Sequence, residues 1–211
     1  MRIAVVTEVS TLEKNHFVIE ALAGRGHEIL NAGMKKDVDG PELTYIHTGL
    51  LSAILLNSGC ADLVVGGCGT GQGYLNSVMQ YPGISCGLIE SPLDSWLFAQ
   101  INGGNCLSLA LNKGFGWAGD VNLKFIFDRF FEVEIGCGYP EHRKESQKKS
   151  RTTLMEISKM SHIPFEELLR KMNGEIINRV LTFPGVKEIT EKYSAPENVV
   201  RKALDERYEA L

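Results

Sequence analysis

Short apolar runs alternate with longer segments of helical periodicity over about the first 135 residues of this 211-residue chain. Five runs rich in β-branched and small apolar residues predict strands over residues 2–7, 28–31, 61–66, 85–89 and 106–109. The spacing of apolar residues predicts helices over residues 13–23, 44–57, 74–80, 93–100 and 120–131. This alternation is typical of parallel strands joined by right-handed helical crossovers. The pattern therefore predicts a doubly wound α/β domain with a five-stranded parallel sheet.

The character of the chain changes after the sequence Gly-Tyr-Pro at residues 138–140, because no further β-branched runs follow. Helices are predicted over residues 142–160, 164–172, 175–181 and 196–211. We therefore expect a Rossmann-like α/β domain over residues 1–140 and a helical C-terminal extension over residues 141–211. An extension of this size buries little core alone, so it should pack on the domain or on a neighbouring subunit.

Composition narrows the classes of function. Apolar residues make up 44% of the chain, charged residues 23%, and the formal net charge is −4. No basic stripe with interleaved aromatic residues is present, which argues against a nucleic-acid partner. The first apolar run is broken by Glu8, and no apolar stretch approaches the roughly 20 residues that span a bilayer. We expect neither a signal peptide nor a membrane segment.

Five cysteines are scattered along the chain in odd number and without any Cys-x-x-Cys pair. Neither a disulfide framework nor a structural zinc site is therefore indicated. Reduced thiols fit a cytoplasmic location. The cysteines are Cys60, Cys68, Cys86, Cys106 and Cys137.

A glycine-rich turn follows the third predicted strand. Residues 66–73 read Gly-Gly-Cys-Gly-Thr-Gly-Gln-Gly, and ligands of open α/β sheets bind beyond the C-terminal ends of the strands. The first strand ends in Thr-Glu-Val-Ser at residues 7–10, without the glycine fingerprint of a dinucleotide site, and the Lys and Ser/Thr of a Walker loop are also absent. A nicotinamide enzyme is therefore disfavoured. A tight turn without chemistry is the structural alternative.

Cys68 lies inside this turn, just before a predicted helix. The positive end of the helix dipole favours a thiolate at that place, and a thiolate can take a proton from carbon. The alternative for any cysteine is a small buried apolar residue, which is the interpretation for the other four.

Four segments carry a resemblance to a known family: residues 62–73 with the Cys-Gly-Thr-Gly core, 81–84 (Tyr-Pro-Gly-Ile), 90–92 (Glu-Ser-Pro) and 100–105 (Gln-Ile-Asn-Gly-Gly-Asn). They resemble ribose-5-phosphate isomerase B and the galactose-6-phosphate isomerase subunits, over roughly residues 1 to 143. The resemblance implies a Rossmann-like fold, a homodimer or homotetramer, and aldose-ketose interconversion through a cis-enediolate. It implies no metal and no cofactor, and a small sugar or sugar acid as the only ligand.

The resemblance also implies roles for individual residues. Cys68 would move the proton between C1 and C2, and Thr70 would assist proton movement at the substrate oxygens. The enediolate oxygen would be held by the backbone amides of Gly69, Gly71 and Gly73. Further substrate-binding positions are Glu8, which replaces an aspartate, Tyr45 and Asn102.

Several positions depart from the family pattern. Ile101 replaces the ring-opening histidine, and Val9 replaces the histidine that follows the first-strand acid. Tyr139 and Pro140 replace an arginine and a histidine that handle phosphate, although Arg143 still aligns with an arginine. Such a site is poorly equipped to open a furanose ring or to hold a phosphate dianion.

These departures, together with residues 112–117 (Asn-Lys-Gly-Phe-Gly-Trp) and 138–143, resemble a divergent branch that isomerises 4-deoxy-L-threo-5-hexosulose uronate. That open-chain keto-uronate needs neither ring opening nor phosphate binding, and Arg143 or Lys113 could pair with its carboxylate. A sugar-phosphate isomerase is the first alternative, and a non-catalytic sugar or anion sensor is the alternative from another class. A cysteine hydrolase lacks an identifiable base. His47 stays open between a pocket residue and a structural one.

Overall fold

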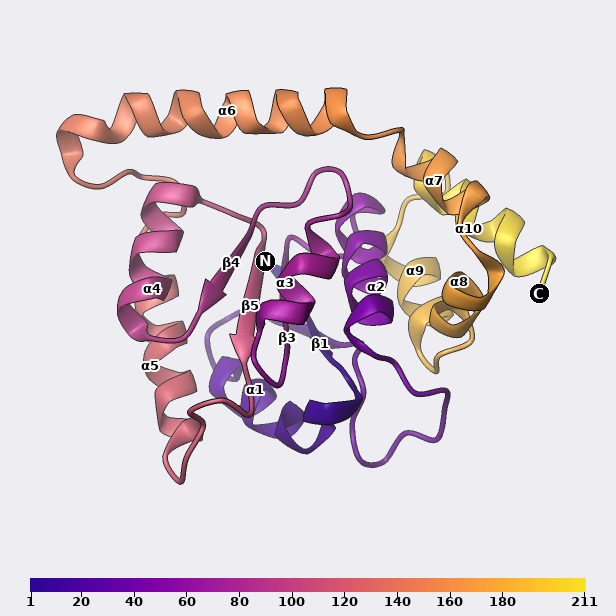
Figure 1. Ribbon diagram of the computed structural model, residues 1–211, viewed down its shortest axis with the longest axis horizontal. Coiled ribbons are helices and arrows are strands. Elements are labelled where there is room, and N and C mark those ends of the chain that lie inside the picture. Colours follow the sequence, from indigo (N-terminus) through magenta and orange to yellow (C-terminus); the bar gives the residue numbers. More distant parts are fainter.

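The computed structural model describes residues 1–211 and contains one five-stranded sheet in the order β2-β1-β3-β5-β4 (Figure 1). The strands are β1 (Arg2–Thr7), β2 (Glu28–Asn31), β3 (Leu63–Cys68), β4 (Cys86–Ile89) and β5 (Cys106–Ala110). Every neighbouring pair is parallel, so all strands end at the same side of the sheet. We call this side the carboxyl edge and the opposite side the amino edge. The predicted doubly wound α/β fold is confirmed.

Helices cover both faces of the sheet, as right-handed crossovers require. The step from β1 to β2 places α1 (Asn15–Leu22) on one face, and the steps toward β3 and β4 place α2 (Tyr45–Asn57) and α3 (Gln72–Val78) on the other. The return step from β4 to β5 places α4 (Pro92–Leu97) on the same face as α1, and α5 (Gly119–Phe131) packs against both α4 and α1. Each face has its own apolar core, with 30 buried residues on the α2/α3 side and 17 on the α1/α4/α5 side.

Local sequence explains where α4 begins. Ser91 is the N-cap, its hydroxyl accepts from the Asp94 amide at 3.2 Å, and the Asp94 carboxylate accepts from the Ser91 amide at 2.9 Å. Pro92 occupies the first helical position, where its missing N–H is not needed. The chain then passes through the π-helical turn η2 (Phe98–Asn102) before β5.

The segment after residue 140 contains helices and no strand, as predicted. It comprises η3 (Glu141–Arg143), α6 (Lys144–Ser161), α7 (Phe165–Lys171), α8 (Gly174–Leu181), α9 (Val186–Tyr193) and α10 (Val199–Glu209). Helices α7 to α10 lie beside α2, and residues such as Phe165 and Ile177 belong to the larger core cluster. Helix α6 instead spans the amino edge of the molecule (Figure 1) and has no buried residue. The division into domains at residue 140 stays a prediction.

None of the helices combines the length and the apolar character that crossing a membrane demands.

Candidate active site

Two neighbouring strands end side by side at the carboxyl edge. Thr7 of β1 pairs in register with Gly67 of β3, so the next residues along, Glu8 and Cys68, lie beside each other. Alternation along a strand places every second side chain on the same face. Val6 and Cys68 both belong to the core cluster on the α2/α3 side, so Glu8, two residues after Val6, points to the same face. Because α1 and α2 cover opposite faces, this is also a topological switch point of the sheet.

Cys68 is the last residue of β3 rather than a turn residue, because β3 begins and ends two residues later than predicted. Its side chain is buried, with 6% of its surface exposed. Its Sγ lies 4.0 Å from the Oγ1 of Thr70. Thr70 is exposed, and its Oγ1 accepts a hydrogen bond from the Gln72 amide at 3.3 Å. Because Oγ1 is the acceptor toward the Gln72 amide, the Thr70 hydroxyl proton stays available for donation to the Cys68 sulfur or to a substrate oxygen.

The glycines of the turn have different roles. Gly71 has a positive φ of 74°, and its amide donates to the Cys68 carbonyl at 3.3 Å, so it closes the turn. The amides of Gly69 and Gly73 donate to no backbone carbonyl, and Gly73 lies in the first turn of α3, where amides have no intrahelical partner. Of the three expected cradle amides, these two are available for an anionic oxygen.

Tyr45 is the first residue of α2 and lies against the start of α3. A Cβ atom on Gly73 would come within 3.3 Å of two atoms of the Tyr45 ring, so the absence of a side chain at Gly73 makes room for this aromatic ring. Tyr45 remains 45% exposed. Its ring therefore forms an open wall beside the glycine-rich turn that follows Cys68, which we call the Cys68 turn.

His47 is occupied in a structural role. Its Nδ1 accepts a hydrogen bond from the Thr44 amide at 3.1 Å, which satisfies a free N–H at the start of α2. Burial lowers the pKa of His47, the nearby Arg179 of α8 lowers it further, and Glu175 opposes these effects. A neutral imidazole is the form that accepts this bond. Helix capping is the role that the structure shows for His47.

Asn102 and Arg143 do not lie with these residues. Asn102 ends the π-helical turn before β5, whereas Cys68 pairs with Ala110 at the far end of β5. Four residue steps along a strand separate the two edges by about 13 Å. Asn102, Ile101 and Arg143 instead line a groove of about 780 Å³ between α6 and the amino edge. Within one chain, the predicted site residues therefore form two groups at opposite edges of the sheet.

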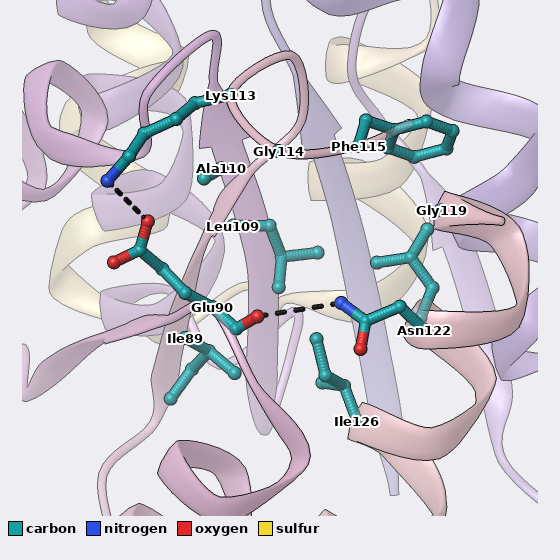
Figure 2. A pocket seen from close by; sticks show the side chains of 11 residues that line it. Ile89, Glu90, Leu109, Ala110, Lys113, Gly114, Phe115, Gly119, Asn122 and Ile126 are labelled. Atoms are coloured by element: carbon teal, nitrogen blue, oxygen red, sulfur yellow. Dashed lines mark hydrogen bonds and ion pairs between the residues drawn. The ribbon is translucent and has the colours of Figure 1, made fainter. Parts of the chain in front are cut away.

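Lys113 also lies away from Cys68. Figure 2 shows its ammonium group pointing toward Glu90, with 2.7 Å between Lys113 Nζ and Glu90 Oε1. Both residues line a small cavity of about 140 Å³ with Leu109 and Ile126, which belong to the core cluster on the α1/α4/α5 side. Cys68 points to the other face of the sheet. Lys113 is therefore already paired and faces a different cavity.

Of the other four cysteines, Cys60 and Cys106 are buried, whereas Cys86 and Cys137 are half-buried. All five are free thiols. Cys86 and Cys106 are partners in the β4–β5 register, and burial raises the pKa of Cys86 well above its ordinary value. No group of three or more His, Cys, Asp or Glu side chains is gathered closely enough to hold a metal ion.

Two polar residues near the turn were not expected from the sequence. The Ser10 hydroxyl donates a hydrogen bond to Oε1 of Glu8. The Asn112 side chain donates to the Ser10 carbonyl at 3.0 Å, and the Asn112 backbone amide donates to the Gly69 carbonyl at 3.0 Å. Single polar residues in loops have no sequence pattern that distinguishes them, because only the fold brings these loops together.

A thiol and a carboxylate side by side, next to available amide groups, form a site suited to moving protons on a substrate whose oxygen becomes negative. Proton-transferring isomerases are the class of enzyme that such a site defines. The sequence model described as Ribose/Galactose Isomerase matches residues 3–148. The chain belongs to this family and is a sugar isomerase.

Solved structures agree with this assignment. A 4-deoxy-L-threo-5-hexosulose-uronate ketol-isomerase, solved with tartrate, is 35% identical, with 97% of this chain and 100% of that chain covered and a TM-score of 0.92. A ribose-5-phosphate isomerase from Vibrio parahaemolyticus is 38% identical, with 98% of each chain covered and a TM-score of 0.92. Ribose-5-phosphate isomerase B from Clostridium thermocellum, at 21% identity and a TM-score of 0.61, covers 77% of this chain and 100% of its own and shares the fold. A search of curated proteins found no match.

Proposed function

We propose that the protein interconverts the aldose and ketose forms of an open-chain keto-uronate, 4-deoxy-L-threo-5-hexosulose uronate, through a cis-enediolate. The observation that carries this proposal is that Cys68 and Glu8 directly follow the last register pair of β3 and β1, Gly67 and Thr7, beside the available amides of Gly69 and Gly73. Val9 and Ile101, at the positions where the family has histidines, offer no group that opens a sugar ring. A ketol-isomerase named for this substrate matches 97% of the chain at 35% identity.

In the proposed reaction, the Cys68 thiolate removes a proton from the carbon beside the substrate carbonyl and returns it to the former carbonyl carbon. The amides of Gly69 and Gly73 hold the oxygen that becomes negative, which is the largest electrostatic contribution in such reactions. The Thr70 hydroxyl donates to the enediolate oxygens, and Tyr45 covers the substrate. These steps use only groups of the chain itself.

We also propose that the working unit is a homodimer, or a homotetramer built from such dimers. Asn102 and Arg143 lie at the amino edge, so they can take part in the site only if a second copy brings them to Cys68. Helix α6 beside them exposes apolar side chains, including Leu154 at 62% and Met160 at 78%. Exposed apolar surface of this kind is typical of an interface. Arg143 of the second copy would then pair with the substrate carboxylate.

The cytoplasm is the proposed location. Its support is the state of the five cysteines, all of which are free thiols. A reducing compartment keeps cysteines in this form.

A sugar phosphate is the second candidate substrate. It is favoured by the ribose-5-phosphate isomerase from Vibrio parahaemolyticus, which is 38% identical over nearly the whole chain. The two relatives are almost equally similar to this chain, so the residues around the site distinguish the candidates better than the identities do.

A direct comparison of the two substrates tests the proposal. The purified enzyme is expected to isomerise the open-chain keto-uronate with a kcat/KM at least about tenfold above that for ribose 5-phosphate. Cys68→Ala should fold normally and lose at least about a hundredfold in kcat, whereas Cys60→Ala, which removes a buried thiol elsewhere, should retain activity. A preference for ribose 5-phosphate would select the second candidate. Binding of both sugars without isomerisation would indicate a sensor.

A further inference from the structure

Glu8 is a buried carboxylate at the mouth of the site. Only 4% of its surface is exposed, yet no cationic side chain lies within ion-pair distance of it. A carboxyl side chain that is buried without a cationic partner is unusual, which makes it a candidate for a functional role. The register of β1 against β3 ends at the pair Thr7 and Gly67, so Glu8 and Cys68 are the next residues along the two chains. Val6 and Cys68 belong to one core cluster, and side-chain alternation directs Glu8, two residues after Val6, to that same face.

The position of Glu8 is fixed from several sides. The Ser10 hydroxyl donates to Oε1 of the carboxylate. The next residue, Val9, donates its amide to the Leu43 carbonyl at 2.8 Å, which holds the backbone after β1. With Oε1 occupied by Ser10, the second carboxylate oxygen is the one left to meet a substrate.

Ser10 in turn belongs to a short chain of contacts that ends at the catalytic turn. Asn112 bridges the Ser10 carbonyl and the Gly69 carbonyl through its side chain and its backbone amide. A Cβ atom on Gly69 would lie 3.7 Å from the Ser10 hydroxyl and 3.4 Å from the Asn112 side-chain nitrogen. Ser10, Asn112 and the Cys68 turn therefore hold Glu8 in one place relative to the thiol.

An aldose-ketose isomerase must move two protons, one between carbons and one between oxygens. We infer that Glu8 is a catalytic residue that carries the hydroxyl proton between the two substrate oxygens, and that Ser10 is the positioning residue for its carboxylate. This inference rests on the proposed function and gives Glu8 a chemical step beyond substrate binding. Thr70, a neutral hydroxyl, stabilises the same oxygens by hydrogen bonding.

The proton balance closes without any further reactant. In the aldose-to-ketose direction, the Cys68 thiolate takes the proton from C2, the C1–C2 double bond forms, and the carbonyl electron pair moves to O1. The Glu8 carboxylate then takes the proton from the O2 hydroxyl and delivers it to O1. The electron pair on O2 forms the new carbonyl, and C1 takes the proton from the Cys68 thiol. Thiolate and carboxylate are both regenerated.

Separate measurement of carbon-proton exchange and of net isomerisation tests this assignment. In heavy water, Glu8→Gln should lose at least about a hundredfold in net aldose-ketose conversion, while solvent exchange of the C2 proton, which depends on Cys68, falls much less. Thr70→Val weakens the hydrogen bond to the enediolate and should lower both rates together. Glu20→Gln, the same change on the exposed face of α1, should leave both rates unchanged.

Substitution of Ser10 provides a second test, in which no buried residue is altered. Ser10→Ala should lower the ratio of conversion to exchange several-fold, because it removes one hydrogen bond to a charged group, and Ser10→Thr should restore the ratio. Equal loss of exchange and conversion in Glu8→Gln, or an unchanged ratio in Ser10→Ala, would overturn the assignment. A wild-type enzyme that catalyses neither process on any sugar would instead contradict the proposed function.

Discussion

Gly71 determines how the chain leaves β3 and reaches α3. Its φ of 74° lies in the left-handed region, and its amide closes the turn on the Cys68 carbonyl. A Cβ atom at this position would also come within 2.5 Å of the Leu88 side chain. The geometry of the turn thus depends on the absence of a side chain for two separate reasons, backbone conformation and space.

These two contributions can be separated by substitution. Gly24 has nearly the same φ, 75°, but nothing within 4 Å of an added Cβ atom. Gly24→Ala should therefore lower the free energy of unfolding by about 1–2 kcal/mol, the cost of the left-handed conformation. Gly71→Ala should lose roughly a further 1–3 kcal/mol through overpacking and should also reduce activity. Urea unfolding measures both losses, and equal losses in the two variants would contradict the steric contribution.

For single residues, the sequence predicts only those features of the site that a short local pattern identifies. The dense glycines identify the turn and its cysteine, and Cys68 and Thr70 do lie together at the carboxyl edge. The partnership of Glu8 with Cys68 depends on the register of β1 against β3, which joins residues 60 positions apart. Ser10 and Asn112 could not be predicted, because their contacts arise only when two loops meet.

Helix α2 links the site to the C-terminal extension. Its first residue is Tyr45, and its N-terminus is capped by His47, which in turn faces Arg179 and Glu175 of α8. Tyr45 and the cap belong to the first turn of α2, so the capping group lies next to the wall of the candidate site.

The His47 cap predicts a dependence of stability on pH. The pKa of His47 is lowered from its ordinary value of 6.5, chiefly by burial, so the folded state favours the neutral ring. As the pH falls below 6.5, the unfolded chain binds a proton that the folded chain resists, and stability present above pH 6.5 is lost. His47→Gln keeps an acceptor for the Thr44 amide and should flatten this loss.

Unfolding free energies measured between pH 7.5 and pH 5 provide the test. The pKa of His27 is also lowered by burial, so His27→Gln is the matched variant that removes the other contribution. His47→Ala, which removes the cap at every pH, should cost roughly 0.5–2 kcal/mol at pH 7.5. An unchanged pH profile in His47→Gln would show that the cap does not titrate.

Helices and strands were predicted best where the apolar residues follow a single helical or strand period. The bounds of β1 and β2 agree with the sequence pattern, whereas β3 extends two residues past its apolar run to Cys68. Gly67 and Cys68 have little intrinsic strand preference, and their pairing with Leu109 and Ala110 of β5 makes them part of the sheet. Helix α9 (Val186–Tyr193) was missed, since its eight residues are mostly polar and are stabilised by packing.

The candidate site residues lie at two opposite edges of the sheet that one chain cannot join. The Cys68 turn lies at the carboxyl edge, and Asn102 lies in the groove under α6 at the amino edge. A sequence pattern identifies the residues of both groups but not the distance between the two groups, because that distance follows from the direction of β5. The proposed dimer resolves it, since a two-fold axis can bring the amino edge of each copy to the carboxyl edge of the other.

Mixing two inactive variants tests this arrangement directly. Cys68→Ala and Asn102→Ala homodimers should each be inactive, because every site lacks one group. In a mixed dimer, one site carries both substitutions and the other carries neither, so random exchange of subunits should restore about a quarter of wild-type activity. Cys68→Ala mixed with Glu8→Gln is the control, since both residues come from the same chain, and it should restore no activity. Restored activity in the control, or none in the first mixture, would exclude a site shared between two copies.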